Sequence, residues 1–105
     1  MKAIIITLCL ALLAQNAQAK RLSVNKVSCL RINAVSEEFE SRAVKILQIS
    51  RRDLVFVGAE LNGVGNCVVV FDTEKYGEVG CTVHEIYADR DTVMADGERI
   101  DRCDR

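Results

Sequence analysis

The chain has 105 residues, of which 14 are basic and 15 acidic, and its formal net charge is −1 at pH 7. This balance, with a pI of about 5.8, excludes the strongly basic surface that a nucleic-acid binder needs to neutralise phosphates. The length suits one small domain.

Residues 1–19 have the pattern of a secretory signal peptide. Lys2 supplies a basic start, residues 3–13 are almost entirely apolar, and residues 17–19 read Ala-Gln-Ala, which is typical of a cleavage site. The apolar run is too short for a membrane helix, which needs about 20 residues. Cys9 follows a leucine and not a small residue, so a lipoprotein signal is not indicated.

Cleavage at this site leaves residues 20–105 as a single small domain. Without Lys2 it carries 13 basic and 15 acidic side chains, a net charge of −2. We expect a secreted or periplasmic protein that has no nucleic-acid partner and does not insert into a membrane after cleavage. Its oligomeric state and its host are not determined by the sequence.

Four cysteines remain after cleavage, at Cys29, Cys67, Cys81 and Cys103. An even number in a small exported chain predicts a disulfide framework. Zinc ligands usually come as close pairs, whereas the nearest two cysteines here are 14 positions apart and the chain has one histidine. We therefore expect two disulfides, no metal and no cofactor.

The first two elements are predicted from hydrophobic spacing. Apolar residues between 26 and 33 favour an N-terminal strand, although their alternation is imperfect. Residues 36–51 favour a helix, because Ser36 is a good N-cap and acidic residues follow it in the first turn. A strand over 43–49 is the alternative that the pattern leaves open.

The next three elements are predicted to form an antiparallel meander, which gives an α+β fold. Asn62-Gly63 is a strong signal for a two-residue hairpin turn, and it pairs a strand over 54–61 with one over 64–72. A turn over 73–77 then leads to a third strand over 79–87.

The register of this meander predicts which cysteines pair. If Leu61 faces Val64, Gly58 lies opposite Cys67 on the second strand. If Cys67 in turn faces Cys81 on the third strand, one face of the meander becomes almost entirely apolar, which supports this register. Because four cysteines allow three pairings, a Cys67–Cys81 bond leaves Cys29 to pair with Cys103.

The same register sorts side chains onto two faces, because they alternate along a strand. One face is then almost entirely apolar and carries Leu54, Phe56, Gly58, Cys67, Val69, Phe71, Val79, Cys81 and Val83. The opposite face carries Val55, Val57, Ala59, Val68 and Val70 on the first two strands. We expect the helix over 36–51 to cover this second face.

No motif predicts a reaction. His84 is the one side chain suited to proton transfer near neutral pH, but neighbouring Glu85 points to the other face of its strand, and nothing presents Thr82 as a nucleophile. We expect no catalytic residue, so that a small hydrolase using His84 is only an alternative.

The loop between the second and third strands is the best candidate for contact with a partner. Glu74, Lys75 and Tyr76 form its tip, and an aromatic side chain on a rigid loop is a common anchor in protein recognition. We therefore expect an exported protein-binding module, with inhibition of a secreted or periplasmic enzyme as one form of that function. A subunit of an exported envelope or toxin assembly is the other alternative.

Overall fold

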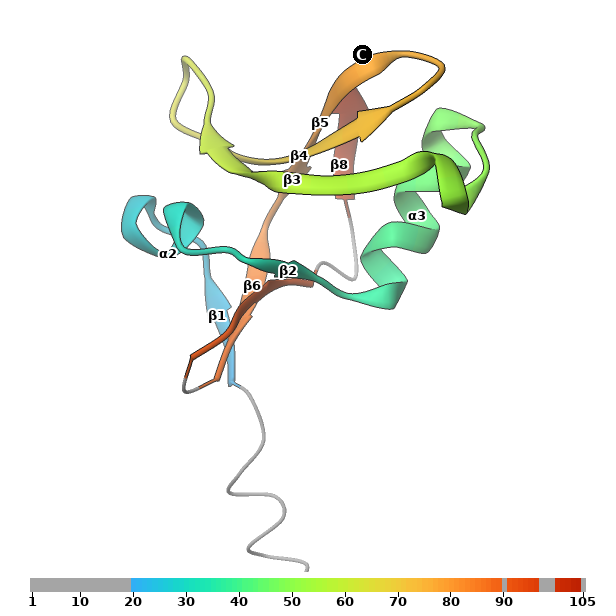
Figure 1. The fold of residues 1–105 in the computed structure, drawn as a ribbon. Helices are drawn as coiled ribbons and strands as arrows, with labels where there is room; N and C mark the ends of the chain where they lie inside the picture. The colour runs from blue at the N-terminus through green and yellow to red at the C-terminus, as the bar shows by residue number, and fades with distance from the viewer. Residues whose placement is uncertain (1–19, 90, 97–99, 105) are drawn as a thin grey trace, which may run out of the picture.

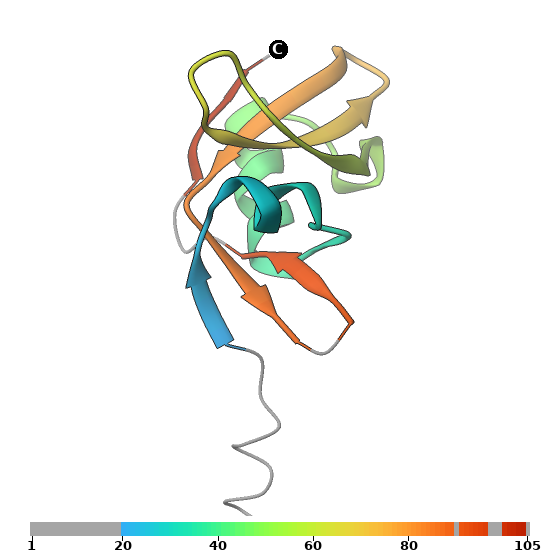
Figure 2. The ribbon, with the colours of Figure 1, turned by 90° about the vertical axis from the view of Figure 1, so that its left-hand side faces the viewer.

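A computed structural model describes residues 20–89, 91–96 and 100–104, with only the backbone at 101. The predicted signal peptide therefore lies outside the described residues. The described chain forms two helices and two four-stranded sheets (Figures 1 and 2). The helices are α2 (Lys26–Leu30) and α3 (Glu37–Leu47), and a short 3-10 turn η1 (Arg51–Asp53) precedes β3.

The sheets have the strand orders β1-β6-β7-β2 and β3-β4-β5-β8. The strands of the first are β1 (Lys20–Ser23), β6 (Glu85–Ala88), β7 (Val93–Ala95) and β2 (Ala34–Val35). The strands of the second are β3 (Leu54–Leu61), β4 (Cys67–Thr73), β5 (Gly77–Val83) and β8 (Ile100–Asp104). The α+β class is confirmed, but the predicted three-stranded meander gains a fourth strand from the C-terminal segment.

The predicted third strand over 79–87 is wrong as a single element. The chain bends at His84, so that β5 belongs to one sheet and β6 to the other. After the bend, β6 pairs with β1 and β7 in the first sheet. The predicted single strand did not include these pairings.

The predicted strand near 26–33 is also wrong, because α2 occupies most of it. Asn25 caps this helix, and its side-chain oxygen accepts a hydrogen bond from the Ser28 N–H at 2.9 Å. The strands of this region lie on either side of the helix, in β1 and β2. The signal that could have revealed the helix is Asn25, a favoured N-cap residue.

The predicted helix over 36–51 is confirmed in kind and is shorter than expected. Ser36 is its N-cap and accepts a hydrogen bond from the Phe39 N–H at 3.1 Å. The helix ends at Leu47 because Gln48 adopts a left-handed conformation, with φ of 57°. The alternative of a strand over 43–49 is therefore excluded.

The hairpin between β3 and β4 is wider than the Asn62-Gly63 signal predicts. Leu61 pairs with Cys67, and residues 62–66 form the connection. Gly65, with φ of 88°, takes the left-handed position, and the Asn62 side chain bonds within the loop. These bonds close a five-residue loop, which displaces Cys67 to the first position of β4.

This displacement overturns the predicted disulfide pairing. Cys81 faces Val69 across β4 and β5, which leaves Cys67 beyond its reach at the end of the strand. The structure contains Cys29–Cys67, which joins α2 to β4, and Cys81–Cys103, which joins β5 to β8. The expectation of two disulfides among these four cysteines is confirmed.

The observed pairing of β4 with β5 differs from the predicted register by two residues. A shift of two keeps each side chain of these strands on its predicted face, so most of the predicted core is confirmed. The exception is Gly58, because a bulge at Val57 reverses the alternation in β3. As a result Ala59 turns inward, whereas Val57 stays exposed.

Helix α3 packs on the inner face of the second sheet and not on the outer face predicted for it. Its Phe39 ring lies 6.2 Å from the Phe71 ring, and both side chains are fully buried. Figure 1 shows α3 and the first sheet on the same side of β3-β4-β5-β8. On the outer face of this second sheet Val55 and Val57 are exposed, whereas Val70 is buried.

Candidate interaction surface at the disulfide-anchored end

Helix α2 presents two aliphatic side chains to solvent from a rigid position. It has five residues, fewer than an isolated helix needs to be stable in water. Its Cys29 is fully buried and bonded to Cys67, which fixes the helix against the β3–β4 hairpin. Val27 and Leu30 lie three positions apart on the other side and are 67% and 58% exposed.

The loop over residues 62–66 presents a third aliphatic side chain beside α2. The Asn62 side-chain oxygen accepts hydrogen bonds from the N–H groups of Val64 and Asn66, at 3.1 and 2.9 Å. The Gly65 N–H donates to the Asn62 carbonyl at 3.0 Å. These bonds hold the loop in one conformation, in which Val64 is 81% exposed.

A polar hollow of about 210 Å³ lies between these two elements. The polar side chains that line it are Asn25 and Lys26 at the start of α2, Asn66 at the end of the loop, and His84 at the bend between the sheets. Figures 1 and 2 place the β3–β4 loop and α2 on the same side of the molecule. We call α2, residues 62–66 and His84 the disulfide-anchored end.

The disulfide-anchored end contains one basic residue, Lys26, and no acid, and further basic residues flank α2 in the chain. Residues 20–31 contain four basic residues and no acid. Lys20, Lys26 and Arg31 are exposed and make no ion pair with a described residue, whereas Arg21 is held by Glu85. This end thus combines exposed aliphatic side chains with positive charge.

The residues that line the hollow beside His84 do not include Thr82 or Glu85, its neighbours in the sequence. No serine, threonine or carboxylate is among the residues that line its hollow, and Cys67 there is held in a disulfide. Glu85 points away and pairs with Arg21, with 3.2 Å between Oε2 and Nε. The polar side chains of this hollow, among them Asn25, Asn66 and His84, can form hydrogen bonds to a ligand.

The loop predicted to contact a partner consists of residues 74–76, and hydrogen bonds from Thr73 brace it. Thr73 Oγ1 accepts from the Tyr76 N–H at 3.0 Å and donates to the Gly77 carbonyl at 2.9 Å. Tyr76 is half-buried and packs against the core, while Glu74 and Lys75 are exposed. This loop lies at the opposite end of β4 from residues 62–66, so the two candidate surfaces are separate.

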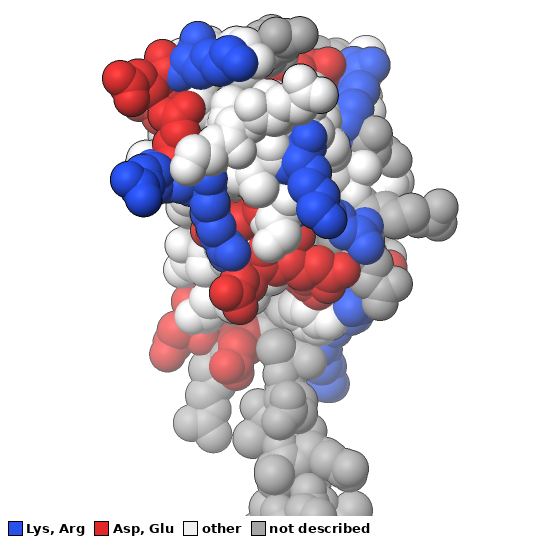
Figure 3. Space-filling view, turned by 90° about the vertical axis from the view of Figure 1, so that its right-hand side faces the viewer, with Lys and Arg blue, Asp and Glu red and all other residues white. Residues whose placement is uncertain are grey.

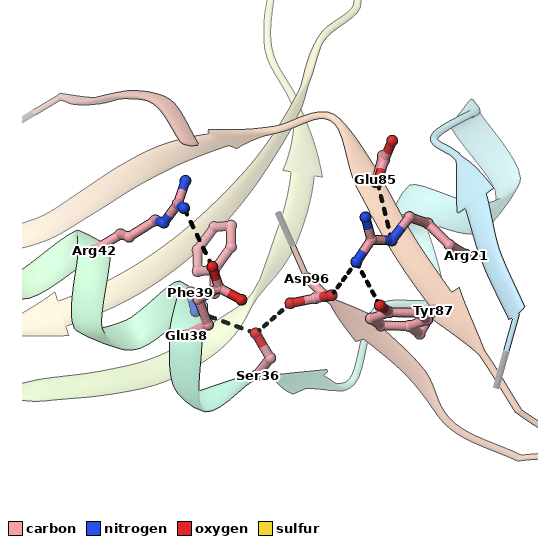
Figure 4. Close-up of polar contacts among 8 residues, drawn as sticks. All are labelled: Arg21, Ser36, Glu38, Phe39, Arg42, Glu85, Tyr87 and Asp96. Atoms are coloured by element: carbon pink, nitrogen blue, oxygen red, sulfur yellow. Dashed lines mark hydrogen bonds and ion pairs between the residues drawn. The ribbon is translucent and has the colours of Figure 1, made fainter. Parts of the chain in front are cut away.

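A cluster of polar side chains joins the N-terminus of α3 to the first sheet (Figure 4). Asp96 is 5% exposed and accepts a hydrogen bond from Ser36 Oγ at 2.8 Å. Arg21 reaches the same carboxylate at 3.5 Å and also contacts Tyr87 and Glu85. Each acid is held by a cation or a hydroxyl, so the arrangement is a structural clamp between β1, β6 and the cap of α3.

A shallow hollow of about 270 Å³ lies on the α3 side, lined by Arg42, Lys45, Ile46 and Ile100. Figure 3 shows this side, where charged side chains of both signs surround a patch of uncharged surface. Arg42 is paired with Glu38 at 3.2 Å. Only Ile46 is an exposed large aliphatic residue here, so this side offers less apolar contact than the disulfide-anchored end.

Comparison with models of known families, with characterised protein sequences and with solved structures finds no match to this chain. Within residues 20–89, 91–96 and 100–104 no helix has the length and apolarity to cross a bilayer. The same residues contain no group of three potential metal ligands.

Proposed function

We propose that this is an exported protein-binding module and that it contacts its partner through the disulfide-anchored end. The observation that carries the proposal is the exposure of Val27, Leu30 and Val64 on two short elements held by a disulfide and by local hydrogen bonds. Aliphatic side chains fixed in advance lose little entropy on binding, which favours affinity.

Export is supported by the signal pattern of residues 1–19 and by the two disulfides, which persist in oxidising compartments such as the periplasm and the extracellular space. Inhibition of an exported enzyme is the finer form of the proposal. A rigid element held by a disulfide suits an inhibitor, because protease inhibitors bind with little change of backbone conformation.

The choice of this end over the loop at Glu74, Lys75 and Tyr76 follows from burial. Tyr76 already contributes to the core, so it has less surface to offer a partner than Leu30 or Val64. Contact by this loop stays a prediction, and its test is the effect of Lys75→Ala and Tyr76→Ala on partner affinity.

Affinity capture with matched variants tests the proposal. The protein is expressed from the full chain, purified oxidised, immobilised and exposed to envelope and culture fractions of its source. The test variant is Val27→Asp with Leu30→Asp, which replaces two aliphatic contacts by charge. The control is Ile46→Asp, which makes the same change at an exposed aliphatic residue on α3.

We expect a partner that the unchanged protein and the Ile46 variant retain and the double variant does not. An enzyme whose activity falls on addition of the protein would support the inhibitor form. Equal retention by both variants would refute the assignment of this end, and retention of nothing by the unchanged protein would refute protein binding.

A further inference from the structure

The outer face of the second sheet is a separate surface. Val55 and Val57 on β3 are 58% and 57% exposed, and Val68 on β4, which pairs with Glu60, is half-buried. Next to Val57 lies a hollow of about 160 Å³, lined also by Gly58, Ala59, Glu60, Val70 and Glu78. Its Val70 lies on the face opposite to that of Phe71, which packs against Phe39 of α3.

Two glycines flank Val70 across the sheet, and they differ in the space beside them. Gly58 and Gly80 both pair with Val70. A Cβ at Gly80 would lie 2.5 Å from Val68 Cγ1, so the valine side chain already occupies that space.

A Cβ at Gly58 would meet nothing within 4 Å, and its φ is not in the left-handed region. Gly58 directly follows the bulge at Val57, and a glycine inside a strand often marks a bulge or a place where a ligand or another chain approaches closely. The open space beside it leaves room for a side chain from a partner.

The charges around this hollow are negative. Glu60 on β3 and Glu78 on β5 border it, and Asp72 lies beside Val55 across β3 and β4. All three are exposed, and none makes an ion pair with a described residue. A cationic segment with apolar flanks is complementary to this surface in both charge and hydrophobicity.

We infer that the outer face of β3-β4-β5 docks a partner segment in which lysine or arginine alternates with aliphatic residues. The aliphatic side chains contact Val55 and Val57, and a cationic side chain enters the hollow above Gly58, between Glu60 and Glu78. This site is distinct from the disulfide-anchored end, which contains one basic residue and no acid.

A synthetic peptide provides the probe. Fluorescein-labelled Gly-Val-Lys-Val-Lys-Val-Gly-amide is titrated with the oxidised protein and binding is followed by anisotropy, with a twin peptide in which glutamate replaces lysine. Gly58→Val fills the hollow, and we expect it to raise the Kd at least about tenfold by steric exclusion. Glu60→Gln with Glu78→Gln is expected to raise it about threefold to tenfold, as for exposed ion pairs.

Matched controls lie elsewhere on the chain. Gly63→Ala adds a side chain at an open loop position, and Asp91→Asn removes an exposed acid; both should leave the Kd unchanged. Leu30→Asp should also leave it unchanged, which separates this site from the proposed function. Gly58→Val should unfold at an unchanged or higher urea concentration, because valine favours strands.

Binding of the lysine peptide alone, with the expected losses, supports the docking site. Absence of binding, equal binding of the glutamate twin, or an unchanged Kd for both Gly58→Val and the Glu60 and Glu78 double variant would overturn it. If Gly58→Val does not fold, the double variant decides. A dimer that Gly58→Val converts to a monomer in sedimentation equilibrium would show that a second copy occupies this face, and would also overturn the inference.

Discussion

Removal of the Cys29–Cys67 bond should destabilise the whole protein and release α2. The change is Cys29→Ala with Cys67→Ala, because both side chains are buried and alanine leaves no unpaired polar atom. The bond closes a loop between residues 38 positions apart, and the chain-entropy model gives about 4 kcal/mol for this length. A domain of this size has a total stability of about 4–13 kcal/mol, so the loss is a large fraction of it.

The matched change is Cys81→Ala with Cys103→Ala. This bond spans 22 positions, for which the same model gives about 3.4 kcal/mol. The two variants should therefore lose similar free energies of unfolding in urea titrations. They should differ in α2, because Cys81 and Cys103 join the paired strands β5 and β8, whereas Cys29 belongs to that helix.

Hydrogen exchange and limited trypsin digestion distinguish the two. In the first variant the Cys29 position should lose protection of its amide, which donates to the Asn25 carbonyl at 2.8 Å in the native helix. Cleavage at Lys26 and Arg31 should accelerate in that variant alone. A loss below about 1 kcal/mol, or equal exchange of α2 in both variants, would refute the claim that this bond anchors the helix.

Three further changes test packing in the second sheet and at the cap of α3, each by the midpoint of urea unfolding. Ser36→Ala removes the N-cap and a hydrogen bond to buried Asp96, and we expect a loss of about 1–3 kcal/mol. Phe39→Ala removes a fully buried ring and should cost about 3–5 kcal/mol. Gly80→Ala places a methyl group against the stiff side chain of Val68, and a loss of about 1–3 kcal/mol is expected. An unchanged midpoint in any of them would contradict the contact concerned.

Much of the second sheet could be predicted from its sequence because hydrophobic alternation is a local signal. The strand over 54–61 was predicted with its observed bounds, and Phe71, Val79 and Cys81 are buried as expected. The faces of the β4 and β5 side chains are predicted correctly although the register is wrong by two residues, because a shift of two returns each side chain to the same face.

The disulfide pairing could not be predicted because it depends on that register. One side chain, Asn62, converts an expected two-residue turn into a five-residue loop, and Cys67 then meets α2 and not Cys81. The bulge at Val57 is equally invisible in an alternating pattern, yet it decides which side of β3 faces solvent. Each of these features results from a few hydrogen bonds.

The candidate surface was missed for a related reason. Val27 and Leu30 were assigned to a strand, where exposure of both would be unexpected, and only the short helix after Asn25 places them together in solvent. The sequence did indicate His84 as a residue of interest. Its neighbours in the hollow, Asn25 and Asn66, come from distant segments that only the tertiary fold brings together.

The central claim is that the Cys29–Cys67 bond anchors α2 in the disulfide-anchored end. Disulfide mapping of the oxidised protein tests it most directly. Trypsin places the four cysteines in four different peptides, which are residues 27–31, 53–75, 76–90 and 103–105. Mass spectrometry without reduction should detect 27–31 linked to 53–75, and 76–90 linked to 103–105. Peptide 53–75 linked to 76–90, with 27–31 linked to 103–105, would contradict the account.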